Sequence, residues 1–290
     1  MATDYAALKA GGFMRQKQKD MFSLRLRVVG GNVTAEQLET IAAVAKKYGH
    51  GYAHLTSRQG VEIPFVPLDD IEAVKAELAA GGVYPGASGP RVRTVTACQG
   101  GQCCPSGRID SLDIAQSLDA RYFGRALPHK FKFGVTGCPN NCLKAEENDF
   151  GVKGCMLTRW NAEACVYCGA CERACRRKAI AISDGALTVD NALCNHCGRC
   201  VEACKKGAWE GESGYQVSFG GTFGNNIQKG SVILPIIRDK ETLFRVADAA
   251  IDYFAEHAQK GERFAKTLER LGWDGLREKV EGAFYANENA

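Results

Sequence analysis

Cysteine spacing is the feature of this sequence that bears most directly on chemistry. Eight of the 14 cysteines fall into two copies of one pattern, C-x2-C-x2-C-x3-C. The first copy consists of Cys165, Cys168, Cys171 and Cys175. The second copy consists of Cys194, Cys197, Cys200 and Cys204. Thiolates are ligands for soft metals and for iron–sulfur clusters, so the repeat predicts a metal or cluster centre.

Two [4Fe–4S] clusters are the interpretation that suits this repeat best. Gaps of two residues let a tight loop supply three corners of a cubane, and in bacterial two-cluster ferredoxins the fourth cysteine of each run ligates the other cluster. We expect one cluster on Cys165, Cys168, Cys171 and Cys204. We expect the other on Cys194, Cys197, Cys200 and Cys175. A pair of zinc sites is the alternative, because C-x2-C pairs also bind zinc.

One departure from the common ferredoxin pattern stands out. The proline that usually follows the last cysteine of such a run is replaced here by Arg176 and Lys205. We expect this change to alter the local backbone and the cluster potential rather than the ligation.

Four further cysteines lie outside the repeat, as a C-x5-C pair and a C-x3-C pair. They are Cys98, Cys104, Cys138 and Cys142. Each pair follows a strand-like segment, and spacing alone predicts a four-thiolate site for zinc or for an iron–sulfur cluster. Cys103 makes the first pair ambiguous by one residue. Cys103 and Cys155 are otherwise surplus, and we expect them to be ordinary buried thiols.

The residues around these four cysteines resemble those of the siroheme-dependent sulfite and nitrite reductases, above all in Cys138-Pro139-Asn140-Asn141-Cys142. The resemblance implies that the four cysteines hold a third [4Fe–4S] cluster, with Cys142 also bridging to the siroheme iron and Asn140 beside the cofactor. The family spacing favours Cys104 over Cys103. A single short unit of this kind, with an inserted two-cluster ferredoxin, looks most like the C subunit of anaerobic sulfite reductases and small dissimilatory-type relatives.

Basic residues in the first half carry the resemblance further. Leu24-Arg25-Leu26-Arg27 and Leu55-Thr56-Ser57-Arg58-Gln59 look like family signatures. The resemblance implies that a bound anion is surrounded by Arg25, Arg93, Lys130 and Lys132, of which the lysines can also donate a proton. It implies that the carboxylates of the siroheme ring are bound by Arg27, Thr56 and Arg58. Without the resemblance, each would be read as part of a solvated strand face. Pro64 stands where some relatives have a histidine, which puts one ring contact in question.

The pattern of apolar residues predicts an α+β fold with mixed and antiparallel sheets. Strands are expected at 22–29, 54–56, 61–66, 91–97, 131–136, 214–219 and 231–237. Helices are expected at 34–48, 69–80, 110–126, 240–259, 262–271 and 274–284, the first of them capped by Thr34.

Four regions follow from this pattern. Residues 1–85 form the ferredoxin-like α/β half of a reductase unit, and residues 86–154 form the siroheme and [4Fe–4S] region. Residues 155–209 hold nine cysteines with few large apolar residues between them, so they are predicted to be the inserted two-cluster ferredoxin domain. Residues 210–290 complete the siroheme domain and form a helical C-terminus.

Composition excludes several classes of protein. A hydrophobic fraction of 45% and a charged fraction of 24% are typical of a globular domain, and the net charge of +4 does not suggest nucleic acid as a partner. Residues 1–20 contain no apolar core of a signal peptide, and no apolar stretch reaches the ~20 residues of a membrane span. We expect a cytoplasmic protein, in which cysteines serve metal or redox chemistry.

The sequence thus predicts the catalytic subunit of a sulfite reductase, which reduces sulfite to sulfide by six electrons on a siroheme coupled to a [4Fe–4S] cluster. Two ferredoxin-type clusters would supply the electrons. The expected partners are sulfite or nitrite, an electron-donor protein or reductase subunit, and a second copy or a paralogous subunit. The alternatives are a siroheme nitrite reductase and a polyferredoxin that only carries electrons.

Overall fold

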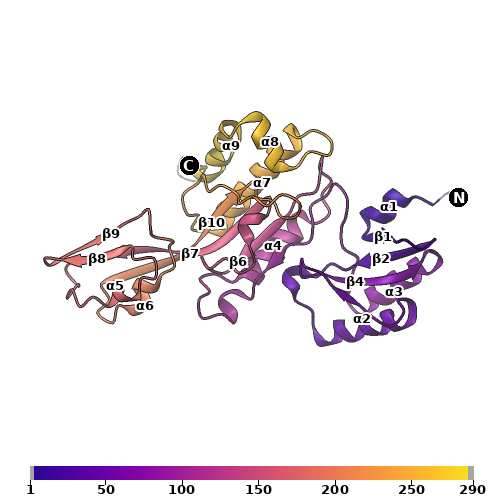
Figure 1. The fold of residues 1–290 in the computed structure, drawn as a ribbon, viewed down its shortest axis with the longest axis horizontal. Helices are drawn as coiled ribbons and strands as arrows, with labels where there is room; N and C mark the ends of the chain where they lie inside the picture. Colours follow the sequence, from indigo (N-terminus) through magenta and orange to yellow (C-terminus); the bar gives the residue numbers. More distant parts are fainter. Residues whose placement is uncertain (1–2, 287–290) are drawn as a thin grey trace.

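The computed structural model describes residues 3–286 of the chain. Figure 1 shows three parts along its long axis. An N-terminal sheet with its helices lies at the right, a central sheet with its helices lies in the middle, and a small cysteine-rich unit extends to the left.

The N-terminal part is an antiparallel sheet with strand order β1-β2-β4-β3. Its strands are β1 (Phe13–Arg15), β2 (Met21–Arg25), β3 (His54–Leu55) and β4 (Val61–Pro67). Its helices are α1 (Tyr5–Ala10), α2 (Ala35–Tyr48) and α3 (Ile71–Ala80). Alternate residues of β2 are buried, and they pack with apolar residues of α2 and α3 in one core. The predicted helices at 34–48 and 69–80 are confirmed, the second after a short 3-10 turn at Leu68–Asp70.

The central part is a mixed sheet with strand order β10-β7-β6-β5. Its strands are β5 (Thr96–Ala97), β6 (Phe133–Thr136), β7 (Phe150–Trp160) and β10 (Trp209–Phe219). Its helices are α4 (Ser111–Tyr122), α7 (Lys240–His257), α8 (Phe264–Leu271) and α9 (Asp274–Tyr285). The three predicted C-terminal helices are therefore confirmed. Phenylalanines from β6, β7, α7 and α8 meet in the core, with neighbouring ring centroids 5.3 to 5.7 Å apart.

Three predicted strands are shorter than expected. The strand predicted at 131–136 begins only at Phe133. The strand predicted at 22–29 ends at Arg25, because Leu26 makes only an isolated bridge with Pro85 and the chain then turns through Val29–Gly31, where Gly30 has φ 61°. The strand predicted at 91–97 is reduced to β5. The N–H of Val95 donates to the carboxylate of Asp119 at 3.0 Å, so it is lost to a regular ladder.

The segment predicted as a strand at 231–237 makes only two isolated bridges, Ser231 with Phe219 and Ile237 with Tyr215. Pro235 lies between them and has no N–H to donate, so a continuous ladder cannot form. The prediction of a regular strand at 231–237 was therefore wrong.

The cysteine-rich unit is carried on an extension of the central sheet. Strands β7 and β10 pair without a break from Phe150 opposite Phe219 to Trp160 opposite Trp209. Beyond this ribbon lie α5 (Ala170–Ala174), β8 (Ile180–Ser183), β9 (Ala186–Val189) and α6 (Arg199–Ala203). The proposed boundaries of the insert, at 155 and 209, fall inside β7 and at the first residue of β10. The sequence did not predict β7, and the domain boundaries stay predictions.

Within residues 3–286, no helix combines the length and the apolar character that crossing a bilayer requires.

The cap of α2 gives a testable statement about stability. The Thr34 side chain accepts the N–H of Gln37 at 3.2 Å, and the Gln37 side chain accepts the N–H of Thr34 at 3.0 Å. Thr34→Ala should destabilise this helix by about 1 kcal/mol. Faster hydrogen exchange of the amides of α2 would report the loss, and Thr34→Ser, which keeps the hydroxyl, should exchange almost as slowly as the parent. Equal exchange in all three proteins would contradict the assignment.

Candidate active site

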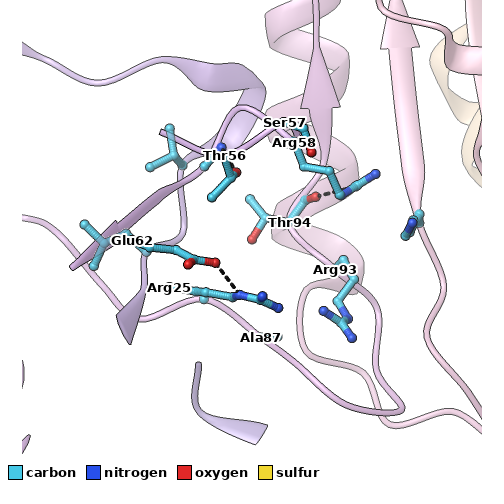
Figure 2. A pocket seen from close by; sticks show the side chains of 13 residues that line it. Arg25, Thr56, Ser57, Arg58, Glu62, Ala87, Arg93 and Thr94 are labelled. Atoms are coloured by element: carbon cyan, nitrogen blue, oxygen red, sulfur yellow. Dashed lines mark hydrogen bonds and ion pairs between the residues drawn. The ribbon is translucent and has the colours of Figure 1, made fainter. Parts of the chain in front are cut away.

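A cavity rich in cations lies where the N-terminal sheet meets the central part of the molecule. Five of the residues predicted as functional line it, namely Arg25, Thr56, Arg58, Arg93 and Lys132. They come from β2, the β3–β4 turn, the segment before β5 and the segment before β6. Its volume is about 200 Å³. Figure 2 shows the side chains of Arg25, Arg58 and Arg93 arranged around this space. We call it the cation cavity.

Each arginine of the cation cavity is held by specific partners. The Nε of Arg25 donates to Glu62 Oε1 at 2.6 Å. Arg58 donates to Asn148 Oδ1 at 3.1 Å and to the carbonyl of Thr94 at 3.4 Å. The Nη2 of Arg93 donates to the carbonyl of Gly89 at 3.0 Å. Partners of this kind fix the direction of each guanidinium and leave further donors free to bind a ligand.

A buried carboxylate beneath the cavity was missed by the sequence analysis. Asp149 is fully buried and accepts the backbone N–H of Lys132 at 2.9 Å. It also accepts Arg263 Nη2, at 2.9 and 3.0 Å to its two oxygens. Arg263 immediately precedes α8, 114 residues along the chain, and belongs to no motif that the sequence displayed. An Asn-Asp pair directly before a buried strand was the available signal.

The charges around the cavity are not balanced by acids. Burial, together with Arg58, Arg263 and Lys130, lowers the pKa of Lys132 to about 8, although Asp149 partly opposes the shift. Burial and neighbouring cations also lower the pKa of Arg93 and of Arg58 to about 10 each. The Nε atoms of Arg93 and Arg263 are buried and have no hydrogen-bond partner among the described residues. Unpaired buried donors in surplus positive charge favour the binding of an anion.

Two predicted residues lie elsewhere. Arg27 does not line the cation cavity: its Nε pairs with the buried carboxylate of Asp119 at 2.7 Å, and its guanidinium lies 4.0 Å from the centroid of the Phe123 ring. The structure thus keeps Arg27 apart from the residues of the cation cavity, and the expectation that it binds a ring carboxylate stays a prediction. Lys130 lines an adjacent cavity together with Arg263 and the loop 222–228, and not the cation cavity itself.

The four cysteines outside the repeat are brought together by the loops at the ends of β5 and β6. Cys98 Sγ accepts the N–H of Gly137 at 3.0 Å and contacts the hydroxyls of Ser111 and Thr136. Burial raises the pKa of the Cys138 thiol, and repulsion from Cys104, Cys142 and Cys98 raises it further. These are the three predicted companions of Cys138.

The surplus cysteines differ from each other. Cys103 does not act on Cys138, and it is exposed, so the expectation of a buried thiol was wrong for this residue. Cys155 is 1% exposed, and burial raises its pKa to about 12, as expected for an inert core thiol.

Close backbone approach explains the glycines of these loops. A Cβ on Gly137 would lie 2.7 Å from the Cα of Gly100, and a Cβ on Gly154 would lie 2.3 Å from the carbonyl oxygen of Gly137. Only glycine allows the two cysteine loops and β7 to pack this tightly. Asn140 and Cys142 are exposed beyond this packing, and no cysteine among the described residues lines the cation cavity.

The eight cysteines of the repeat surround two cavities in the insert. The wall of one includes Cys165, Cys168, Cys171 and Cys204. The wall of the other includes Cys175, Cys194, Cys197 and Cys200. These are the two crossed sets of four that the spacing predicts. Within residues 3–286, no three histidine, cysteine, aspartate or glutamate side chains are close enough to hold a single metal ion. A cubane keeps its ligands farther apart than one ion does.

The role of Arg27 can be tested through stability. Arg27→Met removes the cation but keeps much of the apolar stem, and it leaves Asp119 buried without its partner. We expect the free energy of unfolding to fall by about 3 kcal/mol. The double variant with Asp119→Asn should recover part of the loss, which chemical denaturation of the three proteins would measure. Unchanged stability in Arg27→Met would contradict this structural role and would favour Arg27 as a ligand of a siroheme carboxylate.

The depressed pKa of Lys132 predicts a pH dependence of anion binding. The ammonium is charged below its pKa of about 8 and neutral above it. Affinity for sulfate, whose charge is constant in this range, should therefore fall as the pH rises through about 8. Calorimetric titrations from pH 6 to 9, below the pKa values of about 10 for Arg58 and Arg93, would measure the fall. Lys132→Arg stays charged, so its affinity for sulfate should not fall in this range. A parent affinity that does not change with pH would argue against Lys132 as an anion ligand.

Comparison with known proteins relates this chain to a family. Residues 88–287 match the nitrite and sulphite reductase 4Fe-4S domain, and residues 14–81 match the nitrite/sulfite reductase ferredoxin-like half domain. The chain is 31% identical over 274 residues to the coenzyme F420-dependent sulfite reductase of Methanocaldococcus jannaschii, covering 93% of this chain and 44% of that protein. It is 30% identical over 213 residues to the C subunit of the anaerobic sulfite reductase of Salmonella typhimurium, covering 66% of this chain and 60% of that protein.

The chain thus spans about half of the lengths of these two relatives. It covers 95% of an uncharacterized protein of M. jannaschii, with 32% identity over 281 residues.

Solved structures agree on the fold. Dissimilatory sulfite reductase I superposes with a TM-score of 0.73 at 24% identity, over 90% of this chain and 69% of that one. The NirA protein of Mycobacterium tuberculosis gives 0.69 at 16% identity, over 98% of this chain and 48% of that one. At these identities the likeness shows the fold, and it confirms the predicted α+β reductase architecture. With the family match spanning more than half of its length, the chain belongs to the nitrite and sulfite reductase family.

Proposed function

We propose that this chain is the catalytic subunit of a sulfite reductase, with a siroheme coupled to one [4Fe–4S] cluster and fed by two ferredoxin-type clusters. The observation that carries the proposal is the cation cavity. Arg25, Arg58, Arg93 and Lys132 surround one space, and Arg93 Nε is buried there without a partner among the described residues. A small oxyanion would supply the missing acceptors and the missing negative charge.

The donor sets suit three clusters. Each cavity of the insert is lined by four thiols, and backbone amides already point at sulfur, as in Ala179 N–H to Cys175 Sγ at 3.2 Å. Such hydrogen bonds tune cluster potential. The set of Cys98, Cys104, Cys138 and Cys142 has the same character, with the Thr136 hydroxyl and the Gly137 N–H donating to Cys98 Sγ and the Ser111 hydroxyl in contact with it. Three clusters therefore remain our proposal for the twelve cysteines.

The chain also offers partners for a siroheme, whose ring is rich in carboxylates. Thr56 and Arg58 are available to those carboxylates on one wall of the cation cavity, and Cys142 is available as the bridging thiolate. A cavity of about 200 Å³ encloses an oxyanion or one edge of a macrocycle, but not the whole ring. A ring that reaches both the cavity and the exposed Cys142 must extend beyond the wall. We propose that the extending part is covered by a paralogous subunit or by a second copy of the chain.

Reduction of sulfite requires positive charge to bind the anion and a source of protons. Bisulfite, six electrons and six protons give hydrosulfide and three water molecules. A bound siroheme would supply the electrons to sulfur through its iron. Arg25, Arg58 and Arg93 would hold the oxygens, because each guanidinium presents a rigid fork of N–H donors that can reach two oxygens of one anion. Lys132, with a pKa of about 8, is charged near neutral pH and close enough to its pKa to donate a proton as an oxygen leaves.

Nitrite is the alternative substrate, because the same cation cavity suits either small anion. A chain that only transfers electrons is the alternative from another class. The cation cavity argues against it, since a pure electron carrier does not need a surplus of buried cations over acids. The cytoplasmic location and the electron-donor partner stay predictions from the sequence.

Anaerobic purification followed by an absorption spectrum tests the proposal directly. We expect siroheme bands together with iron and sulfide for three clusters, and turnover of sulfite with reduced viologen. Three clusters without siroheme would instead support a protein that only transfers electrons. Faster turnover of nitrite than of sulfite at equal concentrations would show that nitrite is the substrate.

Removal of Lys132 should separate cofactor binding from catalysis. Lys132→Ala is expected to keep the siroheme bands and to lose turnover by about 10² to 10³, the usual effect of removing one donor to a developing oxyanion. Lys75→Ala is the matched control, because Lys75 pairs with Glu72 on the distant helix α3. Full turnover in Lys132→Ala would remove this lysine from the proposed site.

A further inference from the structure

Arg108 is a charged residue that neither the cluster sites nor the cation cavity accounts for. It lies four residues after Cys104 and shortly before α4, and its backbone N–H donates to the carbonyl of Gly137 at 2.7 Å. It is therefore fastened to both loops of the four-cysteine site. Its side chain is only 9% exposed, which is unusual for an arginine at a surface loop.

The side chain of Arg108 leaves this site and reaches the insert. Its Nε donates to the carbonyl of Cys197 at 2.7 Å, and its Nη1 pairs with Glu202 on α6. One guanidinium thereby joins the four-cysteine site to Cys197 and Glu202, which lie 89 and 94 positions further along the chain. The pair with Glu202 raises the pKa of Arg108, and the thiols of Cys197 and Cys138 raise it further. One guanidinium thus lies in the field of a thiol from each cysteine set.

A second contact supports the same docking. The N–H of Met156 on β7 donates to the carbonyl of His196 at 2.8 Å. A Cβ on Gly198 would lie 2.5 Å from Met156 Sδ, so the cysteine loop 194–200 is seated directly on the ribbon. The other cysteine loop faces outward, with Val166, Tyr167 and Cys168 exposed. The two halves of the repeat are therefore not equivalent in their position.

We infer that Arg108 is a positioning residue that clamps the cysteine loop 194–200 against the four-cysteine site and so fixes the route of electrons between them. The inference rests on the proposed function for the clusters. The cluster on Cys194, Cys197, Cys200 and Cys175 is then the inner one, and the cluster on Cys165, Cys168, Cys171 and Cys204 is the outer one. In each transfer the inner cluster loses one electron and the four-cysteine cluster gains it, with no bond broken and no proton moved.

The geometry explains why an arginine is used. A surface ion pair contributes little by itself, because solvent screens it. Arg108 adds a hydrogen bond from a largely buried, charged donor to a backbone carbonyl, and its planar fork serves both acceptors at once. A lysine could keep the pair with Glu202 but has no second rigid donor aimed at Cys197.

The test compares Arg108→Gln with Arg159→Gln in the protein loaded with its clusters. Arg159 is the matched control, because it forms an exposed pair with Glu210 at 2.6 Å on the same ribbon. The first readout is hydrogen exchange of the amides of residues 195–203, which does not depend on turnover. We expect exchange about tenfold faster in Arg108→Gln, the effect of losing one hydrogen bond to a charged group, and unchanged exchange in the control.

The second readout is transfer between clusters. The protein is reduced completely and mixed with sulfite, and absorbance and electron paramagnetic resonance follow each cluster. We expect reoxidation of the insert's clusters to slow by roughly tenfold or more in Arg108→Gln, since small misplacement of reacting groups is costly, with the iron content unchanged. Arg108→Lys should fall between the parent and Arg108→Gln. Exchange and transfer rates equal to those of the control would overturn the inference.

Two further outcomes are also decisive. If Arg108→Gln does not load its clusters, Glu202→Gln removes the ion pair alone and should speed exchange a few-fold, on the order expected for one such pair. No change in Glu202→Gln would then overturn the inference. If the protein proves to lack siroheme, the proposed function fails, whereas hydrogen exchange still decides whether Arg108 clamps the insert.

Discussion

Asp149 is the acid around which the cation cavity is built. It is fully buried, and a lone carboxylate in that position would be expensive. Arg263 and the backbone N–H of Lys132 compensate it from two different parts of the chain. Its neighbour Asn148 meanwhile holds Arg58. Two consecutive residues thus connect the segment before β6, the segment before α8 and the β3–β4 turn, and the positions of the cavity cations depend on them.

The charge balance around this acid is incomplete. One buried carboxylate faces Arg58, Lys132 and Arg263, and burial lowers the pKa of Arg58, of Lys132 and of the nearby Arg93. Natural proteins give up local stability in this way mainly where they bind or react with something. A structural network would pair each cation with its own acid, as the Arg25–Glu62 and Arg27–Asp119 pairs begin to do.

The ribbon of β7 and β10 provides the second constraint on the architecture. Its hydrogen-bond ladder runs from the central core into the insert without a hinge, so the cysteine-rich unit is an extension of the sheet rather than a tethered domain. This rigidity is what allows a contact as specific as that of Arg108 with Cys197 to persist. Few large apolar residues lie in the insert's own core, and three of its four buried members, Cys171, Ile180 and Trp209, line the cluster cavities.

Local chemistry allowed much to be predicted from the sequence. Cysteine spacing decides which thiols share a loop, and caps such as Thr34 decide where helices begin, because both depend on neighbours along the chain. The crossed sets of four cysteines, the C-terminal helices and five residues of the cation cavity therefore followed from the sequence and from the resemblance it carries. The spacing of the resembled family favoured Cys104 over Cys103, and Cys104 is one of the cysteines whose repulsion raises the pKa of Cys138.

Only the tertiary structure decided the rest. Arg25 and Arg27 alternate by two and would share a face on a regular strand, but β2 ends at Arg25 and Arg27 turns to Asp119, 92 residues away. Lys130 and Lys132 precede β6 rather than lie within it, and they line different cavities. Arg108 and Arg263 carried no local signal at all. Their partners are 89 to 114 residues distant, and contacts across such separations are set by packing, which no spacing along the chain encodes.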